Sequence, residues 1–201
     1  MSVIDGLYNA EISAGSLMLP ESRRVARFML ANPDPDDWID ALHRENILQK
    51  RSPTTARRQA RLIRKRLDTL DEPAWRMIAD GEQELATQAL LAAAIKHSRL
   101  LGDFMRDVVA GRIRRLEPDL DPGDWDAFLV ECGRRDAKVA SWSDSTRRKL
   151  LQVVLRMLAE ARYIASTRHP QLTPPLLHPD LVRYLRKRSE TSVLAAMELA
   201  A

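Results

Sequence analysis

The sequence predicts a mainly α-helical protein with two helix-turn-helix or winged-helix-like units around a central helical segment. Helix-forming Leu, Ala, Arg and Glu are plentiful, whereas aromatic residues make up only 5% of the chain. Most segments carry apolar residues three and four positions apart, which is the period of an α-helix. The pattern Asp-Pro-x-Asp-Trp occurs twice, at 34–38 and at 121–125. We therefore expect an N-terminal unit at 1–81, a central segment with a linker at 82–118 and a C-terminal unit at 119–201.

The N-terminal unit is expected to begin with two short helices. Apolar spacing from Pro20 predicts a helix that ends near Asn32. Asp34 is a suitable N-cap for the next helix, because its carboxylate can accept hydrogen bonds from the first backbone N–H groups. Asn46 is suited to a left-handed stop after that helix. The buried face of the second helix is expected to consist of Trp38, Ile39 and Leu42.

The third predicted helix runs from Pro53 to Leu67 and is strongly amphipathic. Ser52 is its expected N-cap, and Pro53 suits its first position. The side opposite the apolar stripe is almost wholly cationic. A further short helix follows and ends at Gly81. The apolar stripe comprises Ala56, Ala60, Ile63, Leu67 and Leu70.

The formal net charge is only +4, but it is unevenly distributed. Solvated helix faces usually mix the two signs, because opposite charges four residues apart stabilise a helix and like charges repel. The stretch 50–66 has no acidic residue, while the remaining 24 of the chain's 32 basic residues are outnumbered by its 28 acidic ones. This cluster therefore predicts an anion-binding surface, above all for nucleic-acid phosphates. Its eight cations are Lys50, Arg51, Arg57, Arg58, Arg61, Arg64, Lys65 and Arg66.

The position of the cluster fits a recognition helix, whose N-terminal end contacts base edges in helix-turn-helix proteins. That end carries Thr54, Thr55, Arg57 and Arg58. Phosphate contacts are expected from Arg61, Arg64 and Lys65 further along the helix, and Lys50 and Arg51 are also expected to bind DNA. Whether any of these side chains reads bases stays open at the level of the sequence.

The central segment, Leu85–Val109, is the most apolar part of the chain. It predicts either a helical hairpin or one bent helix with Gly102 as its weak point, followed by a linker at 112–121. The longest uncharged apolar run, Leu85–Ile95, has eleven residues, and a membrane-spanning helix needs about twenty. We therefore expect a buried core helix and no membrane contact.

The C-terminal unit repeats the layout of the first one. A short helix at 126–133 follows the second Asp-Pro-x-Asp-Trp, and Ser143 caps a longer helix. Cations near a helix start oppose the helix dipole, which favours an anion bound beside them. The sequence supports such a bound anion and simple solvation of these cations about equally. Beyond the first turn this helix is so apolar that only the first turn is expected to reach a ligand. The cations of that turn are Arg147, Arg148 and Lys149.

The last part of the chain changes character. Residues 167–177 contain three prolines and are not expected to be helical, and they suit a short β-hairpin or wing. A final amphipathic helix, rich in arginine, is predicted at 178–188.

The sequence shows no catalytic, metal-binding or cofactor-binding motif. It contains no phosphate-binding loop, no glycine-rich nucleotide loop and no Gly-x-Ser-x-Gly elbow. The acidic run from Asp119 to Asp126 is explained by helix capping, because its counterpart near Asp34 also begins a helix. Cys132 is the only cysteine, so we expect a packed thiol in a reducing, cytoplasmic environment. We expect neither an enzyme nor a protein that holds a metal, a cofactor or a small-molecule substrate.

Five segments together resemble a known bacterial family: 8–11, 19–22, 48–52, 86–101 and 145–149. Over nearly its whole length the chain resembles the BrxA family of accessory proteins in BREX (bacteriophage exclusion) defence systems. The resemblance implies a role in phage resistance beside a DNA methyltransferase and ATPases carried by other proteins. It also implies binding of double-stranded DNA through helix-turn-helix or winged-helix elements. The same family has been compared with the RNA-binding antitermination factor NusB.

Three functions therefore remain open. The leading interpretation is sequence-tolerant binding of double-stranded DNA without catalysis, in the company of other BREX proteins. The first alternative is a NusB-like RNA-binding role. The second is a protein–protein adaptor whose basic helix docks on an acidic partner.

Overall fold

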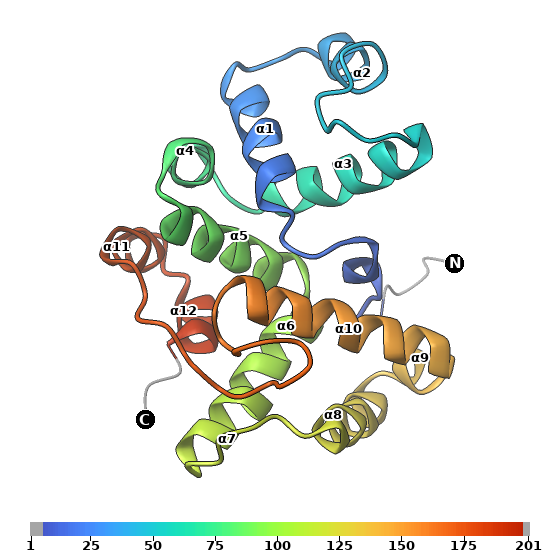
Figure 1. Ribbon diagram of the computed structural model, residues 1–201, viewed down its shortest axis with the longest axis vertical. Helices are drawn as coiled ribbons and strands as arrows, with labels where there is room; N and C mark the ends of the chain where they lie inside the picture. The colour runs from blue at the N-terminus through green and yellow to red at the C-terminus, as the bar shows by residue number, and fades with distance from the viewer. Residues whose placement is uncertain (1–5, 199–201) are drawn as a thin grey trace.

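The computed structural model describes residues 6–198, apart from the side chain of His43, and is mainly helical as predicted. Figure 1 shows the first helices above α5 and the helices after α7 mostly below it. The N-terminal half comprises η1 (Glu11–Ala14), α1 (Leu19–Leu30), α2 (Pro35–His43), α3 (Pro53–Leu67), α4 (Glu72–Asp80) and α5 (Gln83–His97). The centre continues through α6 (Arg99–Asp103), the π-helical segment η2 (Phe104–Val109) and α7 (Ala110–Arg114). The C-terminal part comprises α8 (Pro122–Arg135), α9 (Ala137–Ala140), α10 (Asp144–Glu160), α11 (Pro179–Lys187) and α12 (Thr191–Met197).

Helix α5 is the central element of the fold. Every residue from Leu85 to Ile95 is buried, so the helix has no solvent-facing side over these three turns. Helices α1, α3, α4, α11 and α12 all contact it. The prediction of a buried core helix is therefore confirmed. No helix within residues 6–198 is long and apolar enough to cross a bilayer.

The central segment bends at a different place from the one expected. Ser98 has an extended backbone and its hydroxyl accepts a hydrogen bond from the Leu101 N–H, so α5 ends there and α6 begins. Gly102 lies inside α6 and does not break it. Because α7 extends to Arg114, the linker begins later than residue 112.

The two Asp-Pro-x-Asp-Trp segments form the same local structure. The Asp34 carboxylate accepts hydrogen bonds from the N–H groups of Asp36 and Asp37, and Asp37 accepts one from the N–H of Asp34. Asp121 and Asp124 form the equivalent capping box at the start of α8. Each box satisfies backbone donors that a helix start leaves without partners. Both predicted helix starts are confirmed.

The tryptophans that end these segments differ in burial. Trp125 is 2% exposed, lies 5.1 Å from the Phe104 ring and donates its indole N–H to the Arg147 carbonyl, which joins α8 to α10. Trp38 is only half-buried. Ile39, which was expected in the buried face of α2, is 53% exposed, so that prediction is wrong. Packing of α2 is therefore looser than packing of α8.

Helix α10 is less buried than its sequence suggested. Leu150, Val154 and Leu158 face the core as expected. However, an exposed stripe runs along the whole helix, so the prediction that only its first turn reaches solvent is wrong. This stripe comprises Lys149, Gln152, Arg156 and Glu160.

The expected β wing is reduced to two isolated bridges. Asp119 pairs with Gln171 and Ile164 pairs with Leu172, both in the antiparallel sense. Within residues 6–198 these bridges do not extend into a sheet. The prolines that follow lack backbone donors and restrict further pairing.

The difference in burial between the two tryptophans gives a first prediction. Trp125→Ala should lower the free energy of unfolding by about 3–5 kcal/mol, because it removes a fully buried ring and leaves a cavity. Trp38→Ala should lower it by about 1–2 kcal/mol, because that ring is only partly removed from water. Urea denaturation of the two variants measures both values. Equal losses would contradict the packing described.

Candidate nucleic-acid interface

Helix α3 has the bounds that the sequence predicts, and its apolar stripe faces the core. Ala56, Ala60, Ile63 and Leu67 are buried, and the Ser52 hydroxyl accepts a hydrogen bond from the Thr55 N–H. The buried stripe turns the opposite side of the helix to solvent. That side exposes Thr54, Arg57, Arg58, Arg61 and Lys65, while Thr55 is half-buried.

Three cations of the 50–66 cluster meet carboxylates from outside this stretch, and two of these carboxylates come from distant parts of the chain. Lys50 pairs with Glu21 of α1. Lys65 donates to Glu11 of η1 at 2.6 Å. Arg64 lies 4.0 Å from Asp68 and stacks over the Trp38 ring, 4.8 Å from its centroid. The cluster is free of acids along the chain but not in space.

Arg66 is a structural residue of this cluster. Its side chain is buried and donates to the backbone carbonyls of Ser16 and Gly15. Burial lowers the pKa of the guanidinium to about 10, and the nearby Glu160 opposes this shift. The group stays charged at neutral pH but is not available to a ligand.

The remaining cations of the cluster form what we call the cationic face: Arg51, Arg57, Arg58 and Arg61. All four are exposed, and none forms an ion pair with any residue from 6 to 198. Arg57 lines a hollow between α2 and α3, whereas Arg58 lines another between α3 and η1. Arg61 borders both. The unneutralised charge is therefore concentrated on the N-terminal half of α3 and the residue before it.

In the C-terminal unit the three predicted cations have separate roles. Arg147 folds back and donates to the Ala140 carbonyl, so it belongs to the packing of α9 against α10. Arg148 and Lys149 are exposed and have no ion-pair partner in the part of the chain that the structure describes. Arg156 lies on the same exposed stripe and was not predicted. Its helical spacing from Lys149 was the signal that indicated a shared face.

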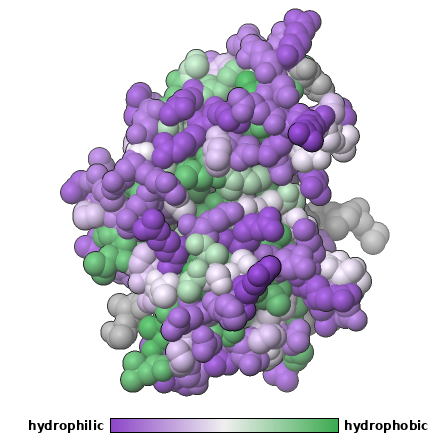
Figure 2. Space-filling view, in the orientation of Figure 1, coloured by the Kyte–Doolittle hydropathy of each residue, from purple (hydrophilic) through white to green (hydrophobic). Residues whose placement is uncertain are grey.

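The 3₁₀ helix η1 contacts both α3 and α10 and so places these two basic helices relative to each other. Figure 1 shows that both helices begin on the same side of the molecule. Residues on the visible surface are mostly hydrophilic, with hydrophobic residues in scattered patches (Figure 2). The first turns of α3 and α10 therefore lie on the same side of the protein.

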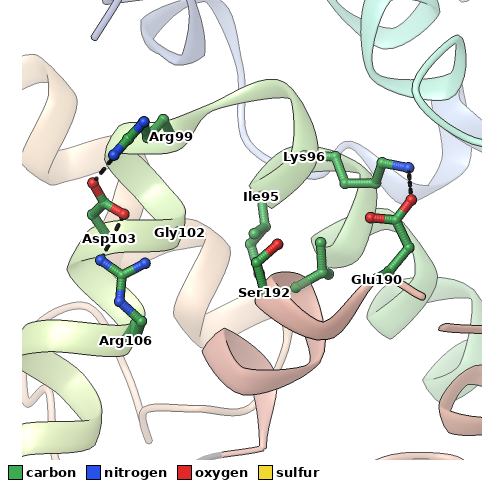
Figure 3. A pocket seen from close by; sticks show the side chains of 9 residues that line it. Ile95, Lys96, Arg99, Gly102, Asp103, Arg106, Glu190 and Ser192 are labelled. Atoms are coloured by element: carbon green, nitrogen blue, oxygen red, sulfur yellow. Dashed lines mark hydrogen bonds and ion pairs between the residues drawn. The ribbon is translucent and has the colours of Figure 1, made fainter. Parts of the chain in front are cut away.

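A larger hollow, of about 460 Å³, lies where α12 meets α5 and α6 (Figure 3). Lys96 pairs there with Glu190, and the Asp103 carboxylate lies between Arg99 and Arg106. Asp103 also accepts a hydrogen bond from the Tyr8 hydroxyl at 2.8 Å. Each of these cations has a carboxylate partner, in contrast to those of the cationic face.

Comparison with known proteins agrees with this architecture. The sequence model of the BrxA family matches residues 6–189. A relative from Paramagnetospirillum magneticum, named BREX protein BrxA, is 42% identical over 193 residues, which cover 96% of this chain and 97% of the relative. The chain belongs to the BrxA family. The resemblance drawn from five short segments is thereby confirmed.

Other members of the BrxA family span almost the same length. A protein of Escherichia coli with the same name is 34% identical and covers 96% of this chain and 91% of its own. One from Bacillus cereus is 28% identical, with 92% of each chain covered. A crystal structure of an uncharacterized protein from Magnetospirillum magneticum is 40% identical, with a TM-score of 0.90 over 96% of this chain and 99% of that one. The arrangement of helices described above is thus shared with an experimentally determined structure.

One contact beside the cationic face of this BrxA-family protein is sensitive to pH. His97 Nε2 lies 3.1 Å from the Glu11 carboxylate that also binds Lys65. Burial lowers the pKa of His97 below its usual 6.5, and Arg66 and Lys65 add to this effect, while Glu11 opposes it. The pKa of Glu11 is also lowered, chiefly by its hydrogen bond from Lys65.

We predict that the protein loses stability as the pH falls through the usual range of histidine. The folded state binds a proton at His97 less readily than the unfolded state, so unfolding is favoured below about pH 6.5. His97→Gln should flatten the dependence of the unfolding free energy on pH between about 7 and 5.5. Urea denaturation at several pH values measures this slope, and an unchanged slope would contradict the assignment to His97.

Proposed function

We propose that this protein is a non-enzymatic, double-stranded DNA-binding member of a BREX phage-resistance system, with α3 as its main contact element. The observation that carries the proposal is the cationic face: Arg51, Arg57, Arg58 and Arg61 are exposed and unneutralised by residues 6–198. Like charges this close repel one another, and an anionic ligand relieves the repulsion. A duplex offers phosphates along a continuous surface.

The chemistry of these side chains supports binding rather than catalysis. All four carry a guanidinium, which holds its proton at neutral pH and so does not act as a general base. The planar group instead donates several hydrogen bonds to a phosphate or to a guanine edge. Thr54, exposed beside them at the start of α3, adds a hydroxyl. The N-terminal half of α3 thus has the donors that a recognition helix uses.

The relatives support the place of the protein in defence. Each of the three curated relatives bears the name BREX protein BrxA. We propose that this chain acts within the same kind of system and that other BREX proteins are among its partners.

The first test replaces Arg57, Arg58 and Arg61 together with Glu. Because these side chains are exposed, the fold should persist by circular dichroism, while affinity for a labelled duplex falls at least about a hundredfold. A control variant with the same change in charge replaces Arg76, Arg134 and Arg183, which are exposed on α4, α8 and α11. The control should keep most of the affinity. Unchanged duplex binding in the first variant would overturn the choice of α3.

The same assay separates DNA from RNA. A structured RNA of equal length serves as the second ligand at the same salt concentration. Tight RNA binding without duplex affinity would replace the proposal with a NusB-like role.

The salt dependence of duplex binding tests whether α10 takes part. Neutralisation of six phosphates by the cationic face together with Arg148 and Lys149 predicts a slope of log affinity against log salt of about −5.4. Without the two α10 residues the slope should be about −3.6. The double variant Arg148→Gln, Lys149→Gln should therefore reduce the steepness by nearly 2. An unchanged slope in this variant would exclude α10 from the interface.

A further inference from the structure

The hollow between α2 and α3 combines apolar and cationic walls. It has a volume of about 290 Å³. Helix α2 contributes Trp38, Ile39 and Leu42, and α3 contributes Arg57, Arg61, Arg64 and Lys65. Within the described part of the chain no carboxylate lines it. We call it the α2–α3 groove.

The apolar side of the groove is partly open to water. Ile39 is 53% exposed, which is unusual for a large aliphatic side chain of this protein. The Trp38 ring is held in place from two sides, by Phe28 at a centroid distance of 5.7 Å and by the Arg64 guanidinium. A fixed aromatic ring beside an exposed isoleucine is a preformed apolar contact surface. Covering it with another apolar side chain is favourable, because it removes this surface from water.

The cationic side of the groove determines the chemistry of its occupant. Arg57 and Arg61 have no ion-pair partner among residues 6–198, whereas Arg64 and Lys65 are engaged by Asp68 and Glu11. Carboxylates placed along α3 would therefore find two free guanidinium groups. Phosphates would satisfy these arginines equally well but would leave Trp38 and Ile39 uncovered. A protein segment with both acidic and apolar side chains fits the groove better than a nucleic-acid backbone does.

We propose that the α2–α3 groove docks an acidic amphipathic helix of a partner protein. The apolar side of that helix would lie on Trp38, Ile39 and Leu42, with Asp or Glu side chains facing Arg57 and Arg61. Two antiparallel or inclined helices with an open groove are a common receptor for such a segment. The groove is therefore an interaction surface distinct in its apolar half from the cationic face.

The docking site stands independently of DNA binding, although the two surfaces share Arg57 and Arg61. A duplex on the cationic face and a segment in the groove would exclude each other at these residues. This last consequence rests on the proposed function, whereas docking itself does not.

Two single variants separate the groove from the cationic face. Ile39→Ser removes apolar surface from the groove at an exposed position and leaves every cation in place. Arg58→Gln removes a cation that borders the hollow beside η1 and does not line the groove. The probes are a labelled synthetic helix with Leu and Phe on one side and Asp and Glu on the other, and a labelled duplex, each followed by fluorescence anisotropy.

The wild-type protein should bind the acidic peptide. Ile39→Ser should weaken peptide binding about tenfold and change duplex affinity less than about twofold. Arg58→Gln should weaken duplex binding about tenfold and change peptide affinity less than about twofold. Peptide binding without duplex binding would keep the groove assignment and overturn the proposed function alone.

Three results would overturn the groove assignment. One is the absence of peptide binding to the wild-type protein. The second is equal peptide affinity of the wild type and Ile39→Ser, with circular dichroism showing both folded. The third is measured with a labelled single-stranded oligonucleotide as an additional probe: Ile39→Ser loses oligonucleotide binding but keeps peptide binding. This result would assign the exposed ring and isoleucine to base stacking.

Discussion

The buried Arg66 and the exposed Glu160 both hydrogen-bond to one short segment and so position the elements on which the candidate interface depends. The Arg66 guanidinium of α3 donates to the carbonyls of Gly15 and Ser16, while the Glu160 carboxylate of α10 accepts hydrogen bonds from the Ser16 hydroxyl and the Leu17 N–H. The short segment after η1 is therefore held between the two basic helices. Because hydrogen bonds from charged groups are strong and directional, this clamp fixes α3 relative to α10. These hydrogen bonds explain why Arg66 is buried although it belongs to the basic cluster.

Other tertiary contacts neutralise part of the basic cluster. Folding brings Glu11 and Glu21 against Lys65 and Lys50, although more than two dozen residues separate each pair along the chain. These contacts neutralise the two ends of the cluster. The uncompensated charge is thereby concentrated on the N-terminal half of α3, where a helix in the major groove makes its contacts. In the folded protein the positive charge that lacks a carboxylate partner therefore covers only a small part of the basic stretch 50–66.

Helix α3 consequently presents two different surfaces to solvent. Arg58 lies toward η1, in a hollow that also includes Glu11, while Arg57 lies toward the apolar side chains of α2. The looseness of α2 matters here, because the half-buried Trp38 and the exposed Ile39 would be covered in a more tightly packed unit. In the second unit the equivalent Trp125 of α8 is fully buried and contacts Phe104 and the first turn of α10. The same sequence motif thus ends in a half-buried tryptophan in one unit and in a fully buried tryptophan in the other.

The sequence by itself determined the local features of this protein. Helix bounds such as Pro53–Leu67, the caps at Ser52, Asp34 and Asp121, and the buried helix at its centre follow from side-chain spacing and from hydrogen bonds between near neighbours. Family membership was also visible in short segments. Only the tertiary structure decided which cations are free, because the carboxylates that pair with Lys50 and Lys65 come from α1 and η1. It also decided the exposure of Ile39 and the open stripe of α10, since the burial of an apolar face depends on what packs against it.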